Sequence, residues 1–194
     1  LDDCANVNAG ITGGGATVGA AYDFGTGLTA AFGAQTTEDA VFTDESLDAY
    51  ALNAAYTADS YGVSVTYGVV ETSTTNEDTY TAFNAYYLPE GSNLPSLSVG
   101  YEIGDIGGAA ATADEKTSFM VGLSWDEVGP GSAGIALGHS STVEGSDEEY
   151  QYEAYYSYPI NDGMTITPLI YSKDNVTSGA DDTTGVMVKT SFSF

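Results

Sequence analysis

The stretch Thr184-Gly185-Val186-Met187-Val188-Lys189-Thr190-Ser191-Phe192-Ser193-Phe194 decides the fold. Every second residue counted back from its end is apolar or β-branched, and the residues between are small or polar apart from Met187. This period of two predicts a strand with two unlike faces. The stretch ends on Phe194, as expected of a strand that closes a membrane barrel and places its aromatic end at the membrane interface.

The composition is that of one acidic, strand-forming domain over residues 1–194. The chain carries Lys+Arg 3 against Asp+Glu 28, a net charge of -25 at pH 7. Because so few cations are present to neutralise phosphates, nucleic acid is excluded as a partner. The abundance of small, β-branched and aromatic residues, among them Gly 24 and Tyr 15, favours amphipathic strands over helices. The chain does not begin with Met, and we expect it to be the C-terminal part of a longer protein.

The alternation recurs along the chain and predicts an all-β, antiparallel transmembrane barrel with about twelve strands here, possibly part of a larger barrel. Strands of roughly nine to eleven residues have the length that a tilted strand needs to cross a bilayer. The expected strands cover residues 5–12, 16–24, 28–36, 48–58, 61–71, 79–88, 96–104, 117–125, 132–139, 149–158, 164–172 and 184–194.

One expected strand, at 79–88, has no predictable facing. Tyr80 and Tyr86 fall on one of its faces, and Phe83 and Tyr87 fall on the other. An aromatic pair on each face removes the contrast that assigns the faces of the other strands.

The connections alternate between short turns and longer polar loops, one of which is expected at 72–78. In outer-membrane barrels the short turns are periplasmic and the long loops face outward. Because the last strand follows a long loop, this order places Phe194 on the periplasmic side. The short connections follow Phe24, Ala58, Leu88, Trp125 and Tyr158.

The two faces of the expected strands suggest different surroundings. One face is small and polar with few charges, and we interpret its charged residues as pore-lining: Asp23, Glu102, Glu153 and Lys189. The other face carries aromatic residues close to the short turns, as in an interfacial girdle. The girdle residues are Phe24, Tyr56, Tyr61, Trp125, Tyr156, Tyr158 and Phe192. The alternative is an acidic soluble or cell-surface β-sandwich with a structural or adhesive role, whose aromatic residues would fill a core.

Three segments carry a resemblance to a known family: residues 122–126, residues 158–168 and residues 182–194. They resemble the C-terminal barrel of cyanobacterial outer-membrane porins, which are grouped with the carbohydrate-selective OprB-type porins. The resemblance is specific over about residues 117–194. The S-layer-homology domain and coiled coil that precede the barrel in that family have no counterpart here.

The resemblance implies an outer-membrane channel that passes ions and small hydrophilic solutes, rather than an enzyme. It also implies a homotrimer in outer-membrane lipid, with Phe194 as the signal read by the barrel assembly machinery. The group name implies sugar selectivity, whereas the cyanobacterial members are better described as general or ion-conducting pores. From the acidic loops we expect a preference for cations.

Two further kinds of site are compatible with the sequence, a calcium site and a hydrolase triad. Acidic clusters at 144–149 and at Asp181-Asp182 could hold Ca²⁺, although their spacing matches no established calcium loop, and no other cofactor is expected. The only histidine, His139, could belong to a Ser-His-Asp hydrolase, but its neighbour Ser140 would point to the opposite face of a strand. We therefore predict no catalytic residue.

Overall fold

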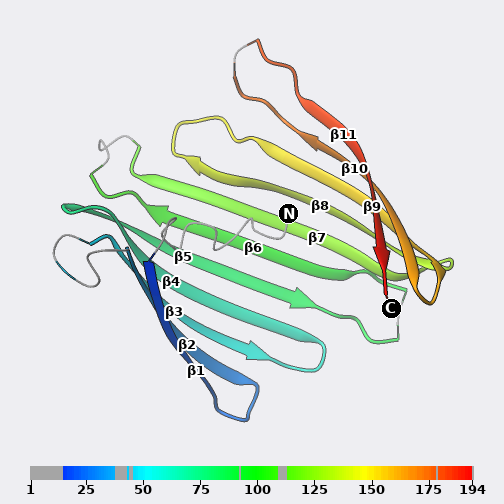
Figure 1. Cartoon of the computed structure of the whole chain (residues 1–194), viewed down its shortest axis with the longest axis horizontal. Coiled ribbons are helices and arrows are strands. Elements are labelled where there is room, and N and C mark those ends of the chain that lie inside the picture. Colours follow the sequence, from blue (N-terminus) through cyan, green and yellow to red (C-terminus); the bar gives the residue numbers. More distant parts are fainter. Residues whose placement is uncertain are drawn as a thin grey trace.

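The computed structural model describes residues 15–37, 43, 46–91, 93–108, 113–177 and 179–193. These residues form one sheet in which eleven strands follow one another in sequence order, each antiparallel to its neighbours (Figure 1). The strands are β1 (Gly15–Asp23), β2 (Leu28–Thr37), β3 (Asp48–Thr57), β4 (Tyr61–Ser73), β5 (Asn76–Tyr87), β6 (Ser96–Asp105), β7 (Glu115–Val128), β8 (Gly131–Val143), β9 (Tyr150–Asn161), β10 (Met164–Lys173) and β11 (Thr183–Phe192). The all-β, antiparallel prediction is confirmed.

The sheet is open: β1 pairs with β2, β11 pairs with β10, and these two outer strands lie at opposite ends of the sheet (Figure 1). Consecutive strands alternate in direction, so the first and the eleventh run the same way. The expected count of about twelve strands becomes eleven among the described residues. The strand predicted at 5–12 lies outside them.

One prediction about the connections is wrong. Residues 72–78 are not a loop, because β4 runs to Ser73, β5 starts at Asn76, and Glu71 pairs with Glu77 across the ladder. The turn between the two strands therefore holds only residues 74 and 75. In addition, β7 extends past Trp125 to Val128, where Gly129 supplies the positive φ of 63° that the turn requires.

The register assigns each residue to one of two faces, because residues paired across a ladder share a face. We call one the apolar face. It carries, from β1 to β11, Val18, Phe32, Leu52, Val65, Phe83, Val99, Val121, Ile135, Ala154, Ile170 and Val186. We call the other the small-residue face. It carries Gly19, Gly33, Ala51, Gly68, Ala82, Glu102, Ser118, Gly138, Gln151, Tyr171 and Gly185.

Burial runs against the usual expectation for a water-soluble domain. Large side chains of the apolar face are exposed, with Leu52 at 59% and Val186 at 75%. The small buried core, made of Ala49, Val70 and Tyr80, lies on the small-residue face. Water-soluble proteins rarely leave a contiguous apolar surface of this extent uncovered. The described residues form no helix that is long and apolar enough to cross a membrane.

Candidate functional site

Asp78 is the centre of a polar cluster on the small-residue face, at the start of β5. Its Oδ2 accepts a hydrogen bond of 2.8 Å from the Tyr80 hydroxyl and lies 3.9 Å from the Lys116 Nζ. Its Oδ1 accepts a hydrogen bond of 2.9 Å from the Gly107 backbone N–H. One buried carboxylate therefore joins β5, β7 and the chain that leaves β6. Its central role was missed because the sequence placed residue 78 in a loop.

Glu102 lies beside these groups on β6. It pairs with Ala82 of β5 on one side and with Ser118 of β7 on the other. Glu102 is 2% exposed and Ser118 is 1% exposed. The Ser118 Oγ is buried and has no hydrogen-bond partner. We refer to Asp78, Tyr80, Glu102, Lys116 and Ser118 together as the inner-face cluster.

Tyrosine rings on the small-residue face lie over glycines of neighbouring strands. A Cβ built on Gly104 would come within 2.5 Å of the Tyr80 ring, and one on Gly62 within 2.3 Å of the Tyr86 ring. Tyr155 lies in the same way over Gly134, and Tyr171 over Gly185. A tyrosine ring that occupies the space left by the absent side chain of a glycine stays close to the sheet. This explains how β5 carries Tyr80 and Tyr86 on the small-residue face while Phe83 and Tyr87 take the apolar face.

The four residues predicted to line a pore share the small-residue face but lie far apart on it. Glu153 pairs with Ala136 and Tyr171 on that face. Asp23 ends β1 and accepts a 2.8 Å hydrogen bond from the Gly25 N–H. Lys189 is exposed on β11, at the opposite end of the sheet (Figure 1). Only Glu102 joins the inner-face cluster, and the pore-lining role of all four stays a prediction.

The aromatic residues predicted to form a girdle lie at the end of the sheet that holds the short turns. Four of them form two neighbouring pairs: the ring centroids of Tyr56 and Tyr61 are 6.0 Å apart, and those of Tyr156 and Tyr158 are 6.5 Å apart. Phe24 follows β1, and its ring centroid lies 4.8 Å from that of Tyr22. Trp125 lies on β7 and Phe192 on β11. Phe194 lies outside the described residues. The membrane role of these rings stays a prediction.

A second aromatic row at the opposite end of the apolar face was not predicted. Phe119, His139 and Tyr150 are paired neighbours on β7, β8 and β9, and the rings of Phe119 and His139 meet edge to face at 4.9 Å. Tyr50 takes a similar position on β3. The signal was present in the sequence, because Tyr50 and Phe119 each precede a turn-end aromatic residue, Tyr56 and Trp125, by six positions on the same strand face.

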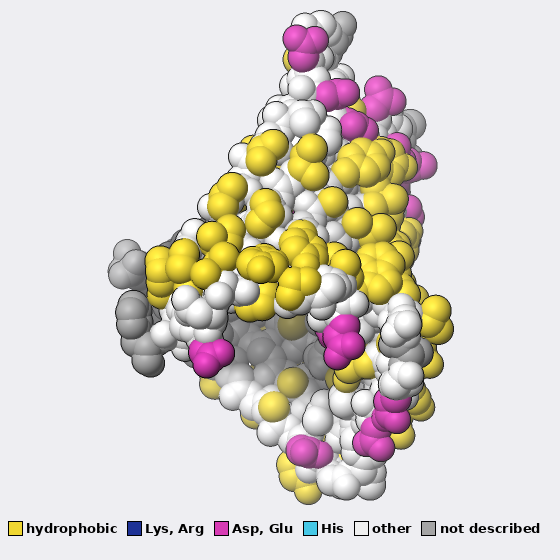
Figure 2. Space-filling model, turned by 90° about the vertical axis from the view of Figure 1, so that its right-hand side faces the viewer, with side chains coloured by type: hydrophobic (Ala, Val, Ile, Leu, Met, Phe, Trp, Pro, Cys, Tyr) yellow, Lys and Arg dark blue, Asp and Glu magenta, His cyan; other side chains and the backbone are white. Residues whose placement is uncertain are grey.

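Between the two aromatic rows, the apolar face of the described strands carries no Asp, Glu, Lys or Arg. Its acidic residues stand near the ends of strands, as Asp48, Glu71 and Asp105 do. Figure 2 shows hydrophobic side chains gathered into a continuous patch, with Asp and Glu around its margins. A face without charge between two aromatic rows is the surface that a bilayer accepts.

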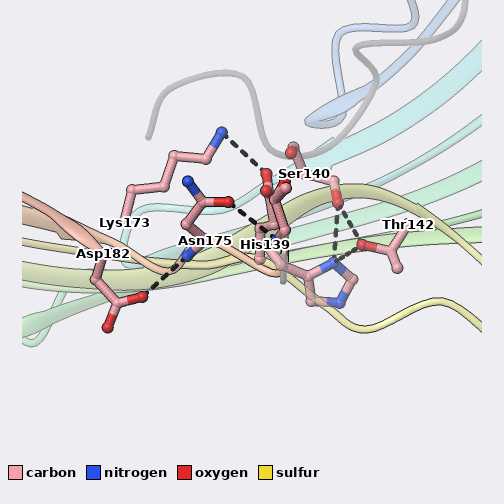
Figure 3. Close-up of polar contacts among 8 residues, drawn as sticks. His139, Ser140, Thr142, Lys173, Asn175 and Asp182 are labelled. Carbon is pink, nitrogen blue, oxygen red and sulfur yellow. Dashed lines mark hydrogen bonds and ion pairs between the residues drawn. The ribbon is translucent and has the colours of Figure 1, made fainter. Parts of the chain in front are cut away.

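Figure 3 shows polar contacts near the ends of β8 to β10. The His139 Nδ1 lies 3.0 Å from the Ser140 carbonyl oxygen and 3.2 Å from the Thr142 Oγ1. Lys173 forms a 3.0 Å ion pair with Glu149. Among the described residues, no group of three or more His, Cys, Asp and Glu side chains is placed to hold a metal ion. The absence of catalysis and the Ca²⁺ alternative both stay predictions.

No family model, no curated protein and no solved structure matches this chain.

Proposed function

We propose that this chain forms the wall of an outer-membrane porin, through which ions and small hydrophilic solutes diffuse with a preference for cations. The observation that supports the proposal best is the apolar face: exposed, uncharged between two aromatic rows, and backed by a face of small and polar residues. Lipid would cover the apolar face, and water would fill the space that the small-residue face encloses. The resemblance to cyanobacterial outer-membrane porins points the same way.

The dimensions of the apolar face fit a bilayer. Tyr50 and Tyr56 are six residues apart on β3, as are Phe119 and Trp125 on β7, which is roughly 20 Å of strand at about 3.3 Å per residue. Outer-membrane barrels carry an apolar band about 25 Å tall with aromatic rows at its two borders. The strands are from 9 to 14 residues long, and β3 and β7 extend past both of their aromatic residues.

A closed channel sets a condition on the strands that complete it. Because β1 and β11 run in the same direction, pairing them directly would be parallel. Closure with antiparallel pairs throughout therefore needs an odd number of further strands. One strand is the smallest such number, and the strand predicted at 5–12 would run in the required direction. A longer porin would supply a larger odd number.

The distribution of charge supports cation preference. The three lysines, Lys116, Lys173 and Lys189, all lie on the small-residue face, and the first two are in ion pairs. With 28 acidic residues in the chain, the cations leave a large excess of negative charge. A negative wall concentrates cations and repels anions.

A planar-bilayer recording tests the proposed channel. The purified chain, refolded in detergent, should give stepwise conductance, and its reversal potential in a KCl gradient should have the sign of cation selectivity. An anion-selective potential would contradict the preference for cations. A chain that is monodisperse without detergent and gives no conductance would instead support the soluble or cell-surface β-sandwich.

Assembly supplies a second test. We propose that Phe194 is the signal read by the barrel assembly machinery and that the mature porin is a homotrimer in outer-membrane lipid. Deleting Phe194 should lower outer-membrane insertion several-fold, measured as heat-modifiable protein in the membrane fraction. Substituting Ser193 by Ala is the matched control and should leave insertion unchanged. Equal insertion of the deletion variant and the wild type would remove the signal role.

A further inference from the structure

The inner-face cluster holds more negative than positive charge in a place with little water. Asp78 and Glu102 are 3% and 2% exposed, and Lys116 is the only cation among the five residues of the cluster. The Tyr80 phenol lies within electrostatic range of both carboxylates. Two carboxylates against one ammonium group give the cluster a net negative charge, and a net negative charge attracts cations. The cluster is therefore an environment that favours an added cation.

Ser118 supplies the second observation. Its hydroxyl group is buried on β7, directly across the ladder from Glu102, and its Oγ has no hydrogen-bond partner. Buried polar groups are nearly always satisfied, so a buried hydroxyl without a partner, on the residue paired with Glu102, needs an explanation. A hydroxyl oxygen and carboxylate oxygens are the ligands that hard cations prefer.

We propose that Asp78, Glu102 and Ser118 form a weak binding site for a hard cation, such as an alkali or alkaline-earth ion, in the wall of the pore. We expect this site to set the selectivity of the channel, a consequence that rests on the proposed porin function. Two carboxylates and one hydroxyl are fewer ligands than a permanent calcium site uses. A site that ions enter and leave has to be weak in this way.

The ion pair between Lys116 and Asp78 makes the site adjustable. At 3.9 Å the pair is long, and the Lys116 side chain is 27% exposed. The ammonium group occupies one side of the Asp78 carboxylate and repels an incoming cation. Removing it should therefore strengthen cation binding, whereas removing Glu102 or the Ser118 hydroxyl should weaken it. A merely structural cluster would not give effects of opposite sign.

The test combines binding and conduction on the full chain in detergent. Ca²⁺ is the binding probe, and its effect is read as the shift in thermal unfolding midpoint across a Ca²⁺ titration. Glu102→Gln and Ser118→Ala should weaken the apparent Ca²⁺ affinity by about tenfold or more, and Lys116→Gln should strengthen it. Glu90→Gln, which removes an exposed carboxylate in the connection between β5 and β6, is the matched control and should behave as the wild type.

Reversal potentials of the same variants in a KCl gradient complete the test. We expect the permeability ratio of K⁺ to Cl⁻ to fall about threefold or more in Glu102→Gln and to rise in Lys116→Gln. If both variants form channels with unchanged selectivity and an unchanged Ca²⁺ response, the proposed cation site is wrong, while the proposed porin function is supported. If the Ca²⁺ response depends on Glu102 but the chain gives no conductance, the cation site is supported and the porin function is wrong.

Discussion

Arginine at Val65, in the middle of the apolar face, should destabilise the membrane-inserted chain by about 2–4 kcal/mol. Val65 lies on β4 between Ala54 and Phe83 and is 38% exposed. If lipid covers this face, Val65→Arg places a charge near the centre of the bilayer, far from either aromatic row. The measurement is the urea midpoint for folding into phospholipid vesicles, with the heat-modifiable band on a gel as the readout of the folded fraction.

Ser64→Arg is the matched control, because Ser64 precedes Val65 on the same strand and faces the other way. It pairs with Ala55 and Asn84 on the small-residue face. An arginine there would reach water inside the channel, so the folding midpoint should change little. Equal destabilisation by the two variants would argue against a lipid-covered face and in favour of a sheet whose two faces are both packed. A Val65→Arg variant as stable as the wild type would remove the membrane interpretation.

The strands were predictable because their two faces differ in composition. The alternation at 96–104 and at 184–194 predicted β6 and β11 to within about two residues, since every second side chain there is apolar. The loop predicted at 72–78 was wrong: Thr, Asn and Glu there resemble a loop, although β-branched residues and ladder pairing continue both strands. The two faces of β5 also could not be assigned from the sequence, because glycines on the adjacent strands make room for Tyr80 and Tyr86 on the small-residue face.

The inner-face cluster was only partly predictable, because register decides it. Glu102 stood out as a charged residue on a polar face. Ser118 is an ordinary serine until the ladder places it opposite Glu102, and Lys116 is an isolated cation until its Nζ is found near Asp78. These partners are separated along the chain by 16 and 38 positions. Alternation within one strand carries no information about which residue of the next strand lies opposite.

The tyrosine that lies over Gly104 leads to a second large expected effect. Gly104→Ala should cost about 1–3 kcal/mol, because its Cβ would come within 2.5 Å of the Tyr80 ring and the ring has to move. The displaced hydroxyl would lose its 2.8 Å hydrogen bond to Asp78. The substitution should therefore lower both the folding midpoint and the Ca²⁺ response of the inner-face cluster, although residue 104 offers no ligand.

Gly33→Ala is the control for this substitution. Gly33 lies on the same face, on β2, but a Cβ there meets nothing within 4 Å. Replacing glycine in a strand without a clash reduces the entropy of the unfolded chain, so Gly33→Ala should be neutral or stabilising by up to about 1 kcal/mol. If the two variants are equally stable, the Tyr80 ring moves aside at no cost. A normal Ca²⁺ response in Gly104→Ala would then show that cation binding does not depend on the position of Tyr80. The site would consist of the two carboxylates and the Ser118 hydroxyl alone.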